Sequence, residues 1–163
     1  MKTLLLLRHA RPTRTSSTGR DFDRPLTVEG RAESQLVGQL LRRRQLTPDA
    51  IICSTAVRAR ETADGVIEAT GFATPLLFRE RIYEASVEQL IELISEAGAD
   101  AEMLLVVGHN PGLEELLERL TGEHAPMLPA TLARIDLNIH AWDELRHAAR
   151  QGQLLFTLSP QAT

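Results

Sequence analysis

The chain has 163 residues, a length that fits one globular domain with little room for a second. Apolar residues make up 43% and charged residues 25%, as in an ordinary protein that buries a core, and the net charge of −4 argues against a broad basic surface for nucleic acid. The single cysteine excludes an internal disulfide and a multi-cysteine zinc site, and no apolar run reaches the roughly 18 residues that a membrane span needs. We therefore expect one cytoplasmic domain over residues 1–163, with residues 160–163 as a flexible tail.

Short apolar runs alternate with helical patterns along most of the chain. The runs 4–7, 50–53 and 103–107 predict strands that are buried on both faces of a parallel sheet. Alternation of apolar and polar residues over 133–139 predicts a strand with one solvated face, and 153–158 a last strand. This order favours an α/β fold, a single three-layer α/β/α domain with a mostly parallel central sheet.

Four helices are expected between and after these strands. Thr27 is a suitable cap for the first, the second begins near Arg58, and a capping box starts the third at Ser86. The fourth begins at Pro111 and ends at Gly122. The apolar face predicted for the first helix consists of Ala32, Leu36, Val37, Leu40 and Leu41.

Arginine and histidine side chains occur at three junctions where a predicted strand ends. Arg8 and His9 follow the first strand, Arg58 opens the helix after the second, and His109 follows the third long apolar run. Ligands of parallel sheets bind beyond the carboxyl ends of the strands. Arginine matches phosphate oxygens, and neutral histidine can act as a nucleophile or proton carrier. Each residue alone could be an ordinary loop or surface residue, but together they predict a phosphate pocket.

Four ordered motifs carry a resemblance to a known family. They are Arg8-His9-Ala10, residues 24–27 with Gly30, residues 54–63 from Ser54 to Ala63, and residues 108–111 from Gly108 to Pro111. This set resembles the histidine phosphatase superfamily, which has a phosphoglycerate mutase-like fold, and within it the SixA-type phosphohistidine phosphatases. Two departures are Ala10, where many relatives have glycine, and Glu61, where relatives often have glutamine; we expect Glu61 to matter for helix packing more than for chemistry.

The resemblance implies a metal-independent phosphatase without a cofactor. His9 would be the nucleophile that receives the phosphoryl group, and Arg8, Arg58 and His109 would surround the phosphate, with His109 stabilising charge if protonated. Arg60 falls at a variable position of the motif and is not assigned to the pocket. The expected substrate is a protein phosphohistidine, with small phosphorylated metabolites, or a module that binds phosphate without turnover, as alternatives.

The general acid is predicted in residues 77–84, a segment that follows a short strand and resembles the family region that supplies this acid. Glu80 fits the position best and Glu84 is the second candidate. A cysteine-based mechanism is rejected, because Cys53 and Arg58 have four residues between them and the loop lacks glycine. Residues 11–24 are long and polar enough to form a movable flap beside the pocket.

Overall fold

A six-stranded sheet forms the centre of the molecule. The computed structural model describes residues 1–160, so most of the predicted tail, residues 161–163, lies outside the described residues. The strand order is β3-β2-β4-β1-β5-β6; β1 to β4 run parallel, whereas β5 and β6 are antiparallel to their neighbours. The predicted α/β fold with a mostly parallel sheet is confirmed. The strands are β1 (Lys2–Arg8), β2 (Ala50–Ser54), β3 (Leu76–Arg79), β4 (Met103–Gly108), β5 (Leu132–Leu137) and β6 (Gly152–Leu158).

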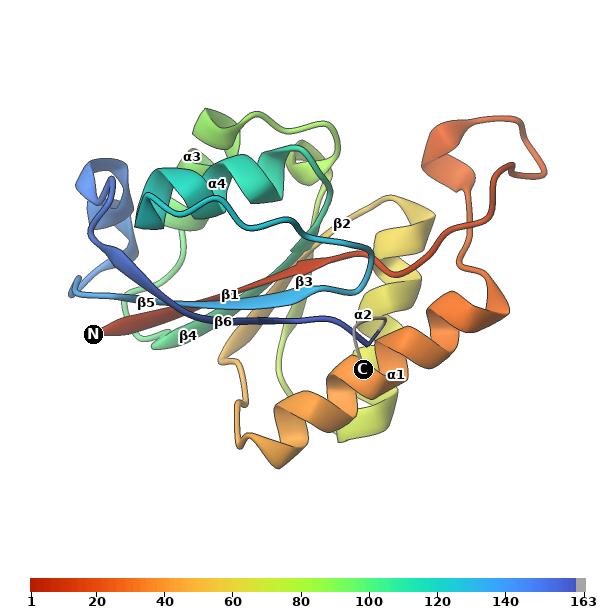
Figure 1. Ribbon diagram of the computed structural model, residues 1–163, viewed down its shortest axis with the longest axis horizontal. Helices are drawn as coiled ribbons and strands as arrows, with labels where there is room; N and C mark the ends of the chain where they lie inside the picture. Colours follow the sequence, from red (N-terminus) through yellow and green to blue (C-terminus); the bar gives the residue numbers. More distant parts are fainter. Residues whose placement is uncertain (161–163) are drawn as a thin grey trace.

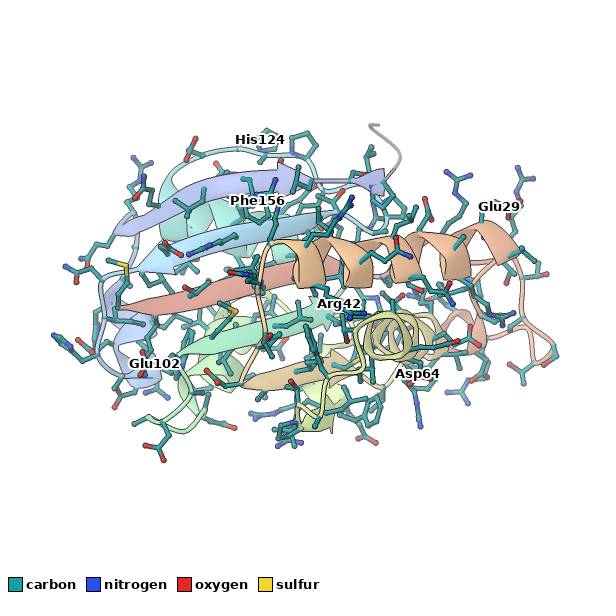
Figure 2. All side chains as sticks on the ribbon, turned by 90° about the horizontal axis from the view of Figure 1, so that it is seen from below. Glu29, Arg42, Asp64, Glu102, His124 and Phe156 are labelled. Atoms are coloured by element: carbon teal, nitrogen blue, oxygen red, sulfur yellow. The ribbon has the colours of Figure 1, made fainter. Side chains whose placement is uncertain are left out.

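Helices cover both faces of the sheet and complete three layers (Figure 1). On one face lie α1 (Val28–Arg43) and α2 (Val57–Thr70), which Figure 2 shows in front of the strands. On the other face lie α3 (Val87–Ser95) and α4 (Gly112–Thr121), packed over a second apolar core. Three short 3-10 helices are η1 (Asp21–Asp23), η2 (Glu80–Ile82) and η3 (Trp142–His147).

The predicted helix caps are present. The hydroxyl of Thr27 accepts a hydrogen bond from the Gly30 amide at 2.9 Å, and Ser86 forms the capping box of α3. Gly122 ends α4 with a φ of 77°, a left-handed conformation that suits glycine. The strand β3 lies at 76–79 and so overlaps the segment 77–84 that was expected to follow it.

The predicted apolar face of α1 is partly wrong. Val37 and Leu41 are buried, but Ala32 is exposed and Leu36 keeps 45% of its surface exposed. The helix turns small residues, including Gly38, toward α2 instead. A Cβ added to Gly38 would lie 2.8 Å from the Ala69 Cβ, so the two helices pack too closely for a larger side chain.

The segment 11–24 leaves the carboxyl end of β1 and projects beyond the body of the domain (Figure 1). Its base is fixed: the Thr27 amide donates to the Arg11 carbonyl at 3.0 Å, the Thr13 amide donates to the Pro25 carbonyl at 2.8 Å, and an antiparallel bridge joins Pro12 to Leu26. Because β1, β2 and β4 are parallel, their carboxyl ends meet at this same edge. Among residues 1–160, no helix combines the length and apolar character of a membrane span.

Candidate active site

The three strand-end loops bring Arg8, His9, Arg58 and His109 together. Arg8 pairs with Gly108 in the β1–β4 register, which places His9 and His109 on adjacent loops. The centroids of the two imidazole rings are 5.1 Å apart. Arg58, in the first turn of α2, is buried and close enough for its charge to act on both histidines. The structure therefore places these four side chains in one cluster, which we call the candidate pocket.

His9 is held in a form suited to nucleophilic attack. Its Nδ1 lies 2.8 Å from the Ala10 carbonyl oxygen, which can only accept, so Nδ1 carries the proton and Nε2 keeps a free lone pair. Burial, together with the charges of Arg58 and Arg8, lowers the pKa of His9 to about 4 against the opposing effect of the Ala10 carbonyl. His9 is therefore neutral at neutral pH.

His109 is neutral as well at neutral pH, so the protonation on which its predicted charge stabilisation depends is absent in the free protein. Burial lowers its pKa to about 3, with His9 and Arg58 contributing. Its Nε2 lies 2.7 Å from the Ser54 hydroxyl, which can donate or accept. A neutral imidazole can still donate one hydrogen bond to a phosphoryl oxygen.

The two arginines are anchored from behind. Arg8 donates from Nη1 to the Met127 carbonyl at 3.0 Å, and Glu114 supplies a nearby negative charge that raises the pKa of Arg8 against the lowering by burial. Arg58 donates to the backbone carbonyl of Asp21 at 2.8 Å and to its carboxylate at 3.0 Å. Both guanidinium groups are thus oriented by fixed acceptors before any ligand arrives.

Several buried polar atoms of this edge lack a partner. Within residues 1–160, the buried side-chain nitrogen and oxygen atoms without a hydrogen bond all belong to the end of β1, the loops after β2 and β4, or the first turn of α2. A buried polar group without a partner costs free energy, and an anion with several oxygens can accept from the donors among them. The atoms are Arg8 Nε, Thr55 Oγ1, Arg58 Nε, His109 Nδ1 and Asn110 Oδ1.

Sequence reasoning missed residues that position the pocket. Thr62 accepts a hydrogen bond from the Ala10 amide at 2.9 Å and donates to the Arg58 carbonyl at 2.7 Å, and so ties the first loop to α2. Glu114 accepts from the Asn110 side chain at 2.9 Å and from the Met127 amide at 2.8 Å. Thr62 lies inside the motif of residues 54–63, which the sequence analysis used for Arg58. For Glu114 the sequence shows only an acidic residue in the first turn of α4.

Asp21 and Tyr83 are also part of the site. The Tyr83 hydroxyl donates to the Asp21 carboxylate at 2.6 Å, and the Tyr83 ring meets the His109 ring edge-on at 5.5 Å. This hydrogen bond, with the charges of Arg58 and Arg24, lowers the pKa of Asp21 to about 2. Asp21 is thus the carboxylate that touches the pocket, and it is ionised at neutral pH, which makes it a poor general acid.

The two predicted acids lie outside the cluster. Glu80 begins η2 with an exposed side chain that makes no hydrogen bond or ion pair to any of residues 1–160. Glu84 is also exposed and has a φ of 58°. The structure brings neither carboxylate into contact with the four pocket residues, and the role of Glu80 stays a prediction.

Arg60 and Cys53 lie away from the phosphate pocket. Arg60 is exposed and its guanidinium stacks over the Phe78 ring at 4.7 Å, whereas Arg58 points inward. Cys53 is fully buried at the end of β2, and burial raises the pKa of its thiol, which makes it a poor nucleophile. Within residues 1–160, no group of three or more histidine, cysteine, aspartate or glutamate side chains is arranged to hold a metal ion.

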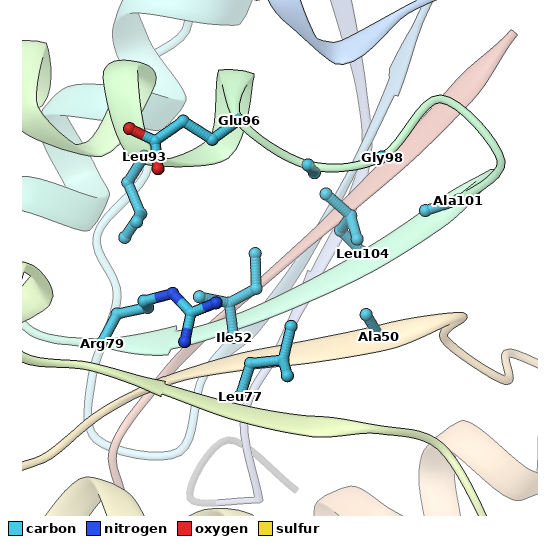
Figure 3. Close-up of a pocket in the computed structure, with 10 residues that line it drawn as sticks. Ala50, Ile52, Leu77, Arg79, Leu93, Glu96, Gly98, Ala101 and Leu104 are labelled. Atoms are coloured by element: carbon cyan, nitrogen blue, oxygen red, sulfur yellow. The ribbon is translucent and has the colours of Figure 1, made fainter.

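A separate cavity lies between α3 and the sheet (Figure 3). It has a volume of about 220 Å³, and Ile52, Leu77 and Leu104 form part of its apolar wall. Arg79 and Glu96 stand at one side of the opening. None of the four clustered residues lines this cavity, so the candidate active site is a different place in the fold.

Comparison with known proteins assigns the family. The profile of the histidine phosphatase superfamily (branch 1) matches residues 4–100, which include His9 and Arg58. An uncharacterised protein of Mycobacterium tuberculosis is 40% identical over 105 residues; the match covers 64% of this chain and spans 63% of that relative's length. An uncharacterised chloroplastic protein of Arabidopsis thaliana is 30% identical over 152 residues, covering 88% of this chain and 70% of that protein.

Solved structures agree with this assignment. A protein of Nakamurella multipartitia assigned as the phosphohistidine phosphatase SixA is 30% identical, with a TM-score of 0.85 and coverage of 98% of this chain and 96% of the other. A SixA protein histidine phosphatase in complex with tungstate shares the fold at 20% identity, with a TM-score of 0.81 and 98% coverage of both chains. The chain belongs to the histidine phosphatase superfamily. Its fold is phosphoglycerate mutase-like, and its structural relatives include proteins of the SixA-type branch, which it resembles.

Proposed function

We propose that this chain is a phosphatase that hydrolyses protein phosphohistidine through a covalent intermediate on His9, without a metal or other cofactor. The observation that carries the proposal is the neutral His9 imidazole, whose Nδ1 proton is held by the Ala10 carbonyl, in a pocket with two anchored arginines. A module that only binds phosphate would need the arginines but not an imidazole with a free lone pair. We keep the cytosol as the place of action, on the basis of the single cysteine.

The reaction has two displacements at phosphorus. In the first, the His9 Nε2 lone pair forms a bond to phosphorus while the bond from phosphorus to the substrate nitrogen breaks, and the leaving imidazole takes a proton from solvent. In the second, water attacks the phosphoryl group on His9, the new P–N bond breaks, and inorganic phosphate leaves as the water proton is released. His9 returns neutral and ready for another cycle.

Charge stabilisation is the main contribution of the surrounding residues. The three equatorial oxygens of the transferring phosphoryl group face Arg8, Arg58 and the neutral His109, which donate hydrogen bonds from fixed positions. In the free protein one carboxylate oxygen of Asp21 accepts from Arg58 Nη2, so a phosphate competes with Asp21 for that nitrogen, whereas Arg58 Nε has no partner and can donate to the phosphate directly. The guanidinium groups supply the positive charge that a metal ion supplies in other phosphoryl-transfer sites.

Substrate chemistry decides how much acid catalysis is needed. An alkoxide leaves only with a proton, whereas a phosphohistidine releases an imidazole that needs less help. Glu80 is the exposed first residue of η2, a position that suits a carboxylic acid reaching the leaving group of a bound ester. We propose that Glu80 is the general acid for such esters. Protein phosphohistidine is favoured as substrate because it depends least on a carboxyl group that has no fixed position in the free pocket.

A substrate panel tests the proposal. Wild-type protein is incubated with a phosphohistidine protein, an alkyl phosphate and a sugar phosphate, each with and without EDTA, and inorganic phosphate is measured. We expect the phosphohistidine protein to give the highest kcat/KM and EDTA to change none of the rates. Faster turnover of a small ester would transfer the assignment to metabolite hydrolysis, and an EDTA-sensitive rate restored by a divalent ion would contradict the metal-free mechanism.

A further inference from the structure

The segment 11–24 encloses a hollow of its own beside the phosphate pocket. The hollow has a volume of about 290 Å³, and its walls include Arg14, Ser16, Arg20, Asp21 and Arg24. The segment carries four arginines and two aspartates within a chain whose net charge is −4. Positive charge is therefore concentrated on a segment that stands over the carboxyl edge of the sheet (Figure 1).

Internal hydrogen bonds give this segment a defined shape. Ser16 donates from its hydroxyl to the Arg20 carbonyl at 2.8 Å, and Thr18 donates to the Asp23 carboxylate at 2.6 Å. Thr13 donates from its hydroxyl to the Thr15 carbonyl at 2.6 Å. The walls of the hollow are thus built by the loop itself and do not need a ligand to form.

The acidic groups of the segment are already paired, whereas among residues 1–160 only one of its four arginine side chains, that of Arg24, has a hydrogen-bond or ion-pair partner. Asp21 accepts from Arg24 at 2.9 Å and Asp23 accepts from Thr18. Arg14 and Arg20 are exposed, and neither side chain forms a hydrogen bond or ion pair with any of residues 1–160. Two guanidinium groups without a partner thus remain on the wall of the hollow.

The hollow and the phosphate pocket share a wall. The Asp21 carboxylate contacts Arg24 on the side of the hollow and Arg58 on the side of the pocket. The positive charge of Arg24 also lies close enough to His9 to act on it. One substrate can therefore have its phosphoryl group at His9 and another part of its structure in the hollow.

We propose that the hollow binds a second anionic group of the substrate, a carboxylate or phosphate near the phosphoryl group, through Arg14 and Arg20. The proposal rests on the phosphatase function proposed above and names the substrates that the site selects: phosphorylated molecules that carry another negative charge nearby. A protein with acidic residues beside its phosphohistidine and a small acid such as a phosphorylated carboxylate both present this chemistry. The arginine fork suits both groups.

Matched substrate pairs test this inference. One pair is two phosphohistidine peptides that carry either glutamate or glutamine beside the phosphorylated residue; the other is phosphoglycolate and ethylene glycol monophosphate. For wild-type protein we expect kcat/KM to be about three- to tenfold higher for the acidic member, the size that one or two exposed ion pairs support. The preference should shrink as salt rises, because the contacts are exposed. The pair with the larger preference identifies the source of the anion.

The variant Arg14→Gln/Arg20→Gln should bring the ratio of the acidic to the neutral substrate close to one. The control Arg42→Gln/Arg43→Gln makes the same change in net charge at the last turn of α1, and we expect it to keep the wild-type ratio. An unchanged ratio in the first variant, or an equal loss in the control, would overturn the inference while leaving the phosphatase intact.

The two proposals can fail separately. If wild-type protein turns over no substrate and His9 takes up no phosphate, the proposed function is wrong. The hollow is then tested by calorimetric binding of phosphoglycolate and ethylene glycol monophosphate to His9→Ala protein. Tighter binding of phosphoglycolate that disappears with the Arg14→Gln/Arg20→Gln substitutions supports the hollow as an anion site. Equal binding of both compounds contradicts it.

Discussion

His9 and Arg58 each keep only 5% of their surface exposed at the carboxyl edge of the sheet, whereas Arg14 and Arg20 of the neighbouring segment 11–24 are fully on the surface. The edge is fixed by buried strands and by hydrogen bonds across three loops, and its cationic groups have anchoring partners. The segment is polar and projects from the domain. The difference separates two tasks: the buried edge is suited to chemistry that is the same for every phosphoryl group, and the segment to selecting what carries it.

The largest effect should come from His9→Ala. Loss of the proposed nucleophile should reduce turnover of every phosphorylated substrate by roughly 10⁴-fold or more, because the Ala10 carbonyl holds the His9 ring with its Nε2 lone pair free for attack. Wild-type protein quenched in alkali should carry one labelled phosphate, and the variant none. Circular dichroism serves as the check that the fold is intact. If the variant kept activity within tenfold of wild type, His9 would not be the nucleophile and the catalytic role of the buried edge would be contradicted.

Arg58→Ala and Arg60→Ala form a matched pair on one helix. The first removes the buried arginine that we propose as a phosphate ligand and should lower kcat/KM by about 10²–10³-fold, as the loss of a preorganised donor does. The second removes an exposed side chain that stacks on Phe78, and we expect less than about threefold. Steady-state kinetics with one aryl phosphate measures both. Equal losses of kcat/KM in the two variants would contradict the assignment of Arg58, and not Arg60, as the phosphate ligand.

Glu80→Gln tests whether an exposed carboxyl group outside the buried edge acts as the general acid. With an alkyl phosphate the rate should fall by about 10²-fold, the lower end of what general acids contribute, because the poor leaving group needs a proton. With a phosphohistidine or an aryl phosphate the rate should change little. Glu84→Gln is the control, and a selective loss there would move the role to Glu84. If neither variant distinguishes the leaving groups, this segment supplies no acid.

The depressed pKa values of the two buried histidines predict a pH-dependent stability. As pH falls below 6.5 the unfolded chain binds protons that native His9, with a pKa of about 4, does not bind, so stability is full above pH 6.5 and is lost as pH falls toward 4. We expect His9→Asn to remove about 2 kcal/mol of the loss between pH 7 and 4.5. Urea unfolding at the two pH values measures it. An identical loss in both proteins would contradict the assigned burial effect.

The smallest effect is expected for Asp21→Asn. Without the carboxylate, a phosphate no longer competes with Asp21 for Arg58. KM for an aryl phosphate should therefore fall about two- to fivefold, the range of an exposed ion pair, while kcat stays nearly unchanged. Asp23→Asn, on the same short helix but bonded to Thr18, is the control. A rise in KM for Asp21→Asn would mean that Asp21 orients Arg58 more than it occupies it.

The buried edge could be predicted from the sequence because its signal is local. Apolar runs mark the strands, parallel strands end at one edge, and Arg8, His9, Arg58 and His109 follow them directly. The short helix caps were predictable for the same reason. The relevant groups lie within four residues of each other, so the pattern itself defines the contact.

The remaining features depend on contacts between distant segments. The hydrogen bond from Tyr83 to Asp21 joins residues 62 apart, and the path of two loops decides it. The neutral state of His109 follows from burial together with nearby positive charges, which only a folded pocket has. The exposed Leu36 was placed on the buried face because the hydrophobic pattern cannot show that Gly38 and its small neighbours make the close contact with α2.

The hydrogen bonds at the base of segment 11–24 have a consequence for how the family can diversify. Thr13 and Arg11 are bonded to the chain that enters α1, and a side chain at Gly30 would collide with the Arg11 carbonyl. Both ends of the segment are therefore fixed to each other by backbone hydrogen bonds, which do not depend on the side chains between them. Residues 14–20, which precede the Arg58 anchor Asp21, form a cassette that can be exchanged, lengthened or recharged without disturbing the sheet or this anchor. Transplanting this cassette between two members should transfer substrate preference while the recipient keeps its own catalytic rate constants.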